Sequence, residues 1–216
     1  MMTMKLEKYF ATSLLLLIST WSVFAARQAN GDSIAVIKTN DGFCVVWNQP
    51  DIHFSFGVKG KDVRLMDRPE TGSIPFNVDG VVFQIQTVAT SKFVKNARKQ
   101  NLSDGSILLA HRDWELQYLE QTAGGKLNVT STPQKLNNGS QALIWKYDKP
   151  KKRGSEQMYL TVVSGANVVM LNGVISGRNT ESVVRQLLLN TVSTLTVSRR
   201  PIDPLKLRES LQRNTR

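Results

Sequence analysis

Cysteine is almost absent from this chain of 216 residues, which contains a single one, Cys44. One cysteine excludes an internal disulfide, so burial of apolar side chains must hold the fold together. Cys44 stands beside Phe43, Val45 and Trp47, and this apolar setting favours a buried core thiol. A reactive nucleophile and an intermolecular disulfide are the alternative interpretations of Cys44.

Histidine is also scarce, because the chain contains only His53 and His111. A Ser-His-Asp triad would need one of them, and no Gly-x-Ser-x-Gly motif is present. Two distant histidines and one cysteine do not supply the closely spaced ligands of a zinc site. Calcium-loop and phosphate-loop motifs are missing too. The sequence therefore predicts no catalytic residue, cofactor or metal ligand, and we interpret His111 as a hydrogen-bonded histidine in the core or at its boundary rather than as a base.

Acidic residues are few, since 17 Asp and Glu stand against 28 Lys and Arg and give a net charge of +11. This charge favours an anionic partner: an acidic protein, a polymer of the cell envelope, or a membrane surface touched peripherally. Nucleic acid is not favoured, because the basic clusters contain no interleaved aromatic residue beyond Phe93.

Three basic clusters are the candidate sites for an anion or a partner, and a solvated surface is the alternative interpretation of each. The candidate residues are Lys92, Lys95, Arg98, Lys99, Lys149, Lys151, Lys152, Arg153, Arg199 and Arg200.

Long apolar runs are missing except near the N-terminus, where two lysines precede an apolar segment that begins at residues 10–18. This pattern is typical of a signal peptide, which would cover residues 1–26 and be cleaved after Ala25 or Ala26. An uncleaved anchor is the alternative. We expect an extracytoplasmic protein, either periplasmic or secreted.

The rest of the chain has the length of one domain, which we expect at residues 27–198. Residues 199–216 are basic and contain two prolines. We predict a flexible tail there, with a short helix built on Leu205, Leu207 and Leu211 as the alternative.

Short β-branched and apolar runs separated by glycine, asparagine and aspartate indicate strands joined by tight turns. Such turns connect antiparallel neighbours only, so we expect an α+β fold with a largely antiparallel sheet and helices packed on it. The expected strands are residues 33–39, 43–48, 52–58, 74–78, 81–89, 126–132, 141–147, 156–163 and 168–175. The expected helices are residues 103–121 and 180–197.

The first expected helix carries an apolar stripe at helical spacing. The stripe contains Ile107, Ala110, His111, Trp114 and Tyr118. The second helix closes a strand–turn–strand–helix unit at residues 156–197, and its apolar residues are expected to pack on those strands.

Residues 101–198 combine a helix, a meander of four strands and a closing amphipathic helix. Gly139-Ser140-Gln141-Ala142 leads into the second strand of the meander. This order resembles the PsbP-like superfamily, which includes Ran-binding Mog-type proteins and extrinsic subunits of photosystem II. The resemblance implies an α/β/α sandwich that acts as a non-catalytic binding or assembly module.

Three functional hypotheses follow. The first is an extracytoplasmic module that binds a protein or envelope component without catalysis. The second is an electrostatic binder of an anionic polymer or membrane, which would gather the basic clusters on one face. The third is a hydrolase with a dispersed active site, which would need a pocket that holds His53 or His111 beside a carboxylate and a hydroxyl.

Overall fold

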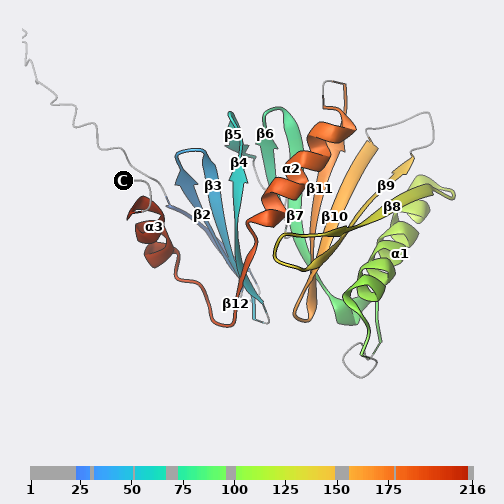
Figure 1. The fold of residues 1–216 in the computed structure, drawn as a ribbon, viewed down its shortest axis with the longest axis horizontal. Helices are drawn as coiled ribbons and strands as arrows, with labels where there is room; N and C mark the ends of the chain where they lie inside the picture. The colour runs from blue at the N-terminus through green and yellow to red at the C-terminus, as the bar shows by residue number, and fades with distance from the viewer. Residues whose placement is uncertain are drawn as a thin grey trace, which may run out of the picture.

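The computed structural model describes residues 23–29, 32–50, 52–66, 73–95, 101–148, 156–177 and 179–213 (Figure 1). Within these ranges the chain forms two antiparallel sheets and three α-helices. The α+β class predicted from the sequence is therefore confirmed, although the strands form two sheets instead of one.

The smaller sheet has five strands in the order β1-β2-β3-β4-β12, and each neighbouring pair is antiparallel. Its strands are β1 (Val23–Ala29), β2 (Asp32–Thr39), β3 (Gly42–Asn48), β4 (His53–Lys59) and β12 (Thr196–Ser198). The three central strands were predicted from the sequence, whereas β1 and β12 were not.

The larger sheet has seven strands in the order β5-β6-β7-β11-β10-β9-β8. Its strands are β5 (Val63–Leu65), β6 (Ile74–Val78), β7 (Val81–Ala89), β8 (Asn128–Lys135), β9 (Gln141–Asp148), β10 (Glu156–Ser164) and β11 (Asn167–Ile175). The pairing of β7 with β11 joins the N-terminal half of the sheet to the C-terminal half. A short 3-10 helix, η1 (Thr90–Lys92), follows β7.

The main core lies between the two sheets and continues beneath α2. Trp47 and Phe54 of the smaller sheet belong to the same buried cluster as Phe76 and Phe83 of the larger sheet. The ring of Phe43 on β3 also contacts Phe76, with centroids 6.4 Å apart. Two sheets form because strands of both halves have one fully apolar face, and packing these faces together removes both from water.

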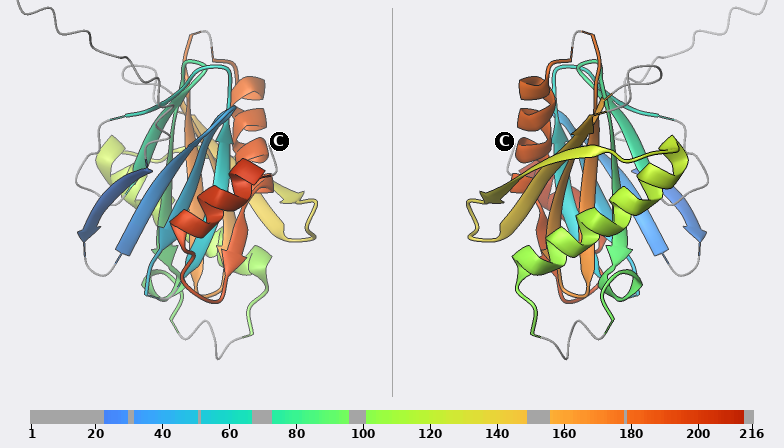
Figure 2. Two further views of the ribbon diagram at one scale, coloured as in Figure 1. Left: turned by 90° about the vertical axis from the view of Figure 1, so that its left-hand side faces the viewer. Right: turned by 90° about the vertical axis from the view of Figure 1, so that its right-hand side faces the viewer.

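Helix α1 (Asp104–Ala123) covers the outer face of the larger sheet. The Ser103 hydroxyl caps its N-terminus by accepting from the Ser106 N–H. Leu108 packs there against Trp145 and Tyr159, whose rings stack at 3.9 Å. Figure 2 shows α1 crossing this face diagonally.

Helix α2 (Glu181–Ser193) packs on the inner face of the larger sheet, beside the smaller sheet. Gly173 of β11 allows the close approach, because a Cβ at this residue would lie 2.5 Å from Val184 Cγ1. The predicted helix continued to Val197, but α2 ends at Ser193. The Thr194 hydroxyl donates to the Thr191 carbonyl and accepts from the Gly57 N–H, which turns the chain into β12.

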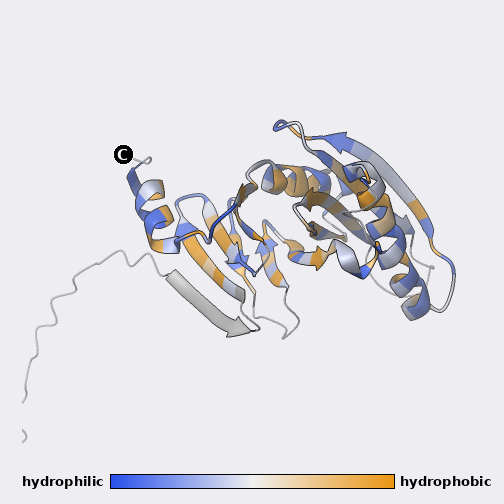
Figure 3. Ribbon diagram, turned by 90° about the horizontal axis from the view of Figure 1, so that it is seen from below, coloured by the Kyte–Doolittle hydropathy of each residue, from blue (hydrophilic) through white to orange (hydrophobic). Residues whose placement is uncertain are grey.

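Helix α3 (Pro204–Arg213) is the short helix that was the alternative to the predicted flexible tail, and it docks on the smaller sheet. Leu207 and Leu211 pack against a buried cluster that includes Ile37 and Cys44. Seen from below, α3 lies outside one sheet and α1 outside the other (Figure 3).

The connection between β12 and α3 is fixed by the side-chain amide of Asn48. Asn48 Nδ2 donates to the Ile202 carbonyl at 3.0 Å, and its Oδ1 accepts from the Ile202 N–H at 2.9 Å. The Asp203 carboxylate then accepts from the Leu205 and Lys206 N–H groups at the start of the helix. The tail was predicted to be flexible from its composition. Composition carries no information on hydrogen bonds between residues as far apart in the sequence as Asn48 and Ile202.

The predicted signal-peptide cleavage site lies within β1. In the structure Ala25 pairs with Ala35 and Ala26 with Ile34. Cleavage after Ala25 would remove the Ala25 pair from β1, and cleavage after Ala26 would remove both pairs, so β1 would be shortened in either case. Residues 1–22 lie outside the described ranges, so the signal peptide stays a prediction. Within the described residues, no helix combines the length and apolarity needed to cross a membrane.

The double hydrogen bond of Asn48 predicts a local effect when it is removed. We expect Asn48→Ala to lower the free energy of unfolding by about 1–2 kcal/mol, because it leaves the part-buried Ile202 amide and carbonyl without partners. Undocking of α3 should also speed trypsin cleavage after Arg199 and after Lys206 and Arg208 of the helix, because cleavage needs a locally unfolded backbone. Limited proteolysis followed by mass spectrometry measures this, and equal cleavage rates in the variant and the parent would contradict it.

Candidate functional site

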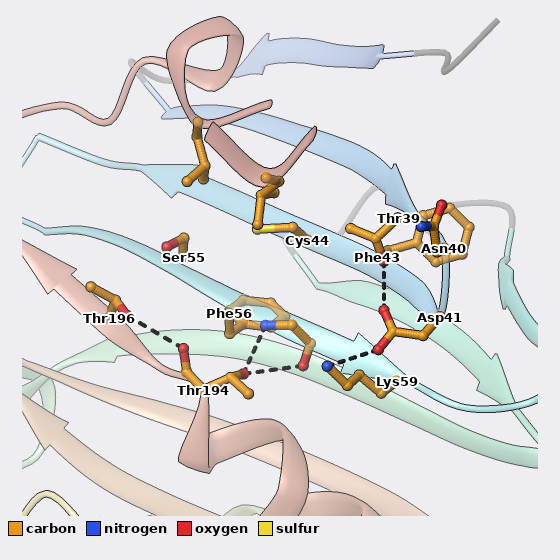
Figure 4. A pocket seen from close by; sticks show the side chains of 13 residues that line it. Thr39, Asn40, Asp41, Phe43, Cys44, Ser55, Phe56, Lys59, Thr194 and Thr196 are labelled. Atoms are coloured by element: carbon orange, nitrogen blue, oxygen red, sulfur yellow. Dashed lines mark hydrogen bonds and ion pairs between the residues drawn. The ribbon is translucent and has the colours of Figure 1, made fainter. Parts of the chain in front are cut away.

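A hollow on the outer face of the smaller sheet, beside α3, is the candidate ligand-binding site (Figure 4). We call it the α3 trough. Its volume is about 570 Å³, which lies within the range of roughly 300–1,000 Å³ found for small-molecule pockets. The surface that it presents is mostly apolar.

Small side chains on neighbouring strands create the floor of the α3 trough. The antiparallel register sets Cys44 opposite Gly57 and Ser55 opposite Thr196. Because strand residues alternate between faces, all four lie on the side away from the main core. Figure 4 shows Cys44 and Ser55 on adjacent strands beneath α3. Two leucines of α3 form the opposing wall.

The trough exists because α3 covers only part of the outer face. The helix packs on residues of β2 and β3, such as Ile37 and Val46. The floor provided by β4 and β12 has no helix above it and no large side chain to fill the space. A hollow therefore remains next to the helix.

A polar group of residues closes one end of the α3 trough at the β2–β3 turn. Lys59 Nζ lies 2.7 Å from Asp41 Oδ2, and the Thr39 hydroxyl donates to Asp41 Oδ1 at 3.1 Å. The hydrogen bond from Lys59 lowers the pKa of Asp41. Both charged side chains are more than half exposed, so this pair contributes little stability but places polar atoms at the rim.

Cys44 lies in the floor of the trough, with 9% of its surface exposed. Burial raises the pKa of its thiol to about 11, so the sulfur is protonated and a weak nucleophile at neutral pH. The interpretation of Cys44 as a buried thiol is confirmed.

Neither histidine lines the α3 trough. His53 lies on β4 opposite Ser198. His111 is fully buried on the sheet-facing side of α1, where it contacts the rings of Phe93 and Trp114. Neither ring nitrogen has a hydrogen-bond partner among the described residues, and Nε2 lies 3.9 Å from Glu115 Oε1. The predicted burial of His111 is thus confirmed, whereas the hydrogen bond predicted for it is not found among the described residues. Among the residues that the structure describes, no group of histidine, cysteine and carboxylate side chains could hold a metal ion.

Four of the ten basic candidates lie in described segments. Lys92 and Lys95 are exposed at and just after η1, and Arg199 and Arg200 are exposed after β12. Both segments lie at the lower end of the molecule in Figure 1 and in Figure 2. None of the four lines the α3 trough. Six candidates lie outside the described residues: Arg98, Lys99, Lys149, Lys151, Lys152 and Arg153.

Comparison with known proteins gives this chain no family. No protein-family model and no curated protein matches it. A crystal structure of a protein from Bacteroides thetaiotaomicron VPI-5482 matches over 71% of this chain and 52% of that one, with 11% sequence identity and a TM-score of 0.31. The chain thus spans about half the length of that protein. A likeness this weak carries no argument, so function must be argued from the site.

Sequence reasoning missed the α3 trough, although one part of its signal was present. The alternation in β4 places His53, Ser55 and Gly57 on one face, and two of these three side chains are too small to cover a sheet. The wall of the trough is formed by Leu207 and Leu211, which lie about 150 residues later in the sequence. Only the folded structure brings this wall next to the small residues of β4.

His111 predicts a pH dependence of stability. Burial lowers the pKa of His111 from 6.5 to about 4, so the folded state binds fewer protons than the unfolded state between these values. The contribution of neutral His111 to the free energy of unfolding is therefore complete above pH 6.5. It falls by about 3 kcal/mol as the pH drops to about 4. Glu115, whose pKa burial raises, partly offsets the loss because it gains a proton in the folded state.

Urea unfolding at several pH values between 7 and 4 measures this dependence, and His111→Phe is the matched variant because its ring suits the aromatic surroundings. We expect the variant to lose clearly less stability than the parent across this range. Parallel curves for the two proteins would show that another group controls the acid sensitivity.

Proposed function

We propose that this chain is an extracytoplasmic, non-catalytic binding module, and that the α3 trough holds the apolar part of its ligand. The observation that carries the proposal is the trough itself: a mostly apolar hollow of about 570 Å³ whose floor is made of small side chains. A ligand with a compact apolar body and a polar end fits this arrangement, with the polar end at the Asp41–Lys59 rim.

The energetics favour an apolar ligand. The surface of the trough includes a cysteine, a glycine and two leucines. Removing such a surface from water contributes roughly 25 cal/mol of favourable free energy per Å² of apolar area. The hydroxyl of Thr194 is already engaged with the Thr191 carbonyl and the Gly57 N–H. The charged side chains that line the trough, Asp41 and Lys59, both lie at the rim, and the floor adds only the hydroxyls of Ser55 and Thr196.

A non-catalytic role is supported by the chemistry of the lining residues. The trough contains hydroxyl groups and a thiol but no histidine to activate them, and the thiol is protonated at neutral pH. The resemblance to PsbP-like modules favours the same role. The extracytoplasmic location rests on the basic and apolar N-terminal segment.

Filling the trough should abolish binding. We expect the wild-type protein to bind N-phenyl-1-naphthylamine, a neutral apolar fluorophore, with an increase in fluorescence. Ser55→Trp places a large side chain on the floor and should weaken binding at least about tenfold, equivalent to a loss of about 1.4 kcal/mol. Thr196→Trp, on the neighbouring strand, should act in the same direction.

Thr130→Trp is the matched control, because it adds the same side chain at an exposed position on β8, far from α3. It should leave fluorophore binding unchanged. Circular dichroism checks that each variant is folded. If both trough variants bind the fluorophore as tightly as the wild type, the ligand site lies elsewhere and the proposal is wrong.

An anionic surface is the second candidate partner, and one observation favours it. The segment that follows β7, which carries Lys92 and Lys95, lies at the same end of the molecule in Figure 1 as the segment that follows β12, which carries Arg199 and Arg200. These exposed cations come from two segments about 100 residues apart. A membrane rich in anionic lipid would contact such an end through several cations at once, each contributing about 1 kcal/mol.

Sedimentation with vesicles of phosphatidylglycerol and phosphatidylcholine tests this contact. The double variant Lys92→Gln/Lys95→Gln should bind about 30-fold more weakly at low salt, from the loss of about 2 kcal/mol. Lys61→Gln/Lys126→Gln removes the same charge at other exposed positions and should change binding little. Equal losses in the two double variants would mean that net charge, not this end of the molecule, drives adsorption.

A further inference from the structure

A second hollow lies on the other side of the molecule, between α1 and β7 of the larger sheet. Its volume is about 590 Å³. We call it the α1 groove. It is lined by Gln86, Trp114, Glu115, Gln117, Tyr118 and Gln121. The groove forms because α1 crosses the outer face diagonally and packs on β9, β10 and β11 (Figure 2), so that β7 has no helix directly above it.

Four lining residues of α1 form one stripe along the groove. Trp114, Gln117, Tyr118 and Gln121 follow the spacing i, i+3, i+4 and i+7, which places them on one side of a helix. Tyr118 was predicted to belong to the apolar stripe of this helix, yet it is 65% exposed. The buried stripe instead runs through Leu108 and His111, so this side of α1 faces the groove and not the core.

Three glutamine side chains in the α1 groove have no hydrogen-bond partner among the described residues, while Glu115 lies 3.9 Å from His111 Nε2. The side-chain amides of Gln86, Gln117 and Gln121 make no hydrogen bond within the described part of the chain. Each amide offers two donor hydrogens and one acceptor oxygen. Beside Gln86 on the same outer face, Gln84 pairs in register with Asn172 of β11 and extends the row of amides.

The charge of the groove differs from that of the whole chain. The chain carries a net charge of +11, but none of the described residues that line the groove is a lysine or an arginine. Glu115 is the only ionisable carboxyl in the lining, and burial raises its pKa. Without a cation, the groove is not suited to phosphate, sulfate or nucleic acid.

We propose that the α1 groove binds a neutral oligosaccharide. The ring of Tyr118, with that of Trp114 beside it, provides a flat apolar surface for the C–H face of a sugar ring. The three glutamine amides provide paired donors and acceptors for adjacent hydroxyl groups, which themselves both donate and accept. Glu115 accepts from a further hydroxyl.

An apolar peptide suits this groove less well. Covering Gln86, Gln117 and Gln121 with apolar side chains would strip the amides of water and leave them unpaired, at a cost of about 1–3 kcal/mol each. A hydroxyl-rich ligand replaces each lost water contact by a hydrogen bond. The site is separate from the α3 trough, so it can exist whether or not the trough binds an apolar ligand.

Isothermal titration calorimetry with three neutral tetrasaccharides tests the proposal: maltotetraose, cellotetraose and chitotetraose. We expect at least one of them to bind, with an affinity that changes little between low and high salt. Tyr118→Ala and Gln117→Ala should each weaken binding about tenfold. Both side chains are exposed on the helix surface, so neither change is expected to disturb folding.

Asp113→Ala is the matched control, because Asp113 is exposed on α1 outside the groove and pairs with Arg112. It should bind the sugar like the wild type. The proposal is overturned if none of the three sugars binds at millimolar concentration, or if Tyr118→Ala binds as tightly as the wild type. Binding that Ser55→Trp abolishes would place the sugar in the α3 trough and also overturn it.

Discussion

The structure depends on how the inner face of the seven-stranded sheet is covered. The smaller sheet covers one part of this apolar face, and α2 covers the other. Gly173 brings α2 close to β11, since any larger residue there would meet Val184. Thr194 then ties the end of α2 to Gly57 of β4. The two covering elements are thus joined to each other, and this joint fixes β12 as the last strand of the smaller sheet.

Both hollows follow from this arrangement, because each lies where one helix covers only part of an outer sheet face. Helix α3 leaves β4 and β12 open, and α1 leaves β7 open. The two exposed parts differ in chemistry. The side chains around Cys44 and Ser55 are small and mostly apolar, whereas those around Gln86 and Tyr118 are amides and aromatic rings. One fold therefore presents two surfaces suited to different classes of ligand.

Local patterns predicted much of the fold, whereas long-range contacts escaped them. The turn at Asp79-Gly80 adopts positive φ at both residues, as the hairpin dipeptide predicts. β12 was missed because Thr196 and Val197 continue the amphipathic pattern of the preceding helix, which only Thr194 interrupts. The docking of α3 was missed because its anchor, Asn48, lies 154 residues from Ile202. Neither candidate site was predicted, since each combines residues from segments that only the sheet register brings together.

The α3 trough cannot be independent of the docking of α3. Two of its lining residues, Leu207 and Leu211, belong to the helix, and both also pack against the smaller sheet. A ligand that contacts them binds only the docked state, so its binding free energy adds to the stability of docking. The same linkage means that a weakly docked helix lowers the apparent affinity. The amide of Asn48, which holds Ile202 just before α3, thereby influences ligand binding through the position of α3.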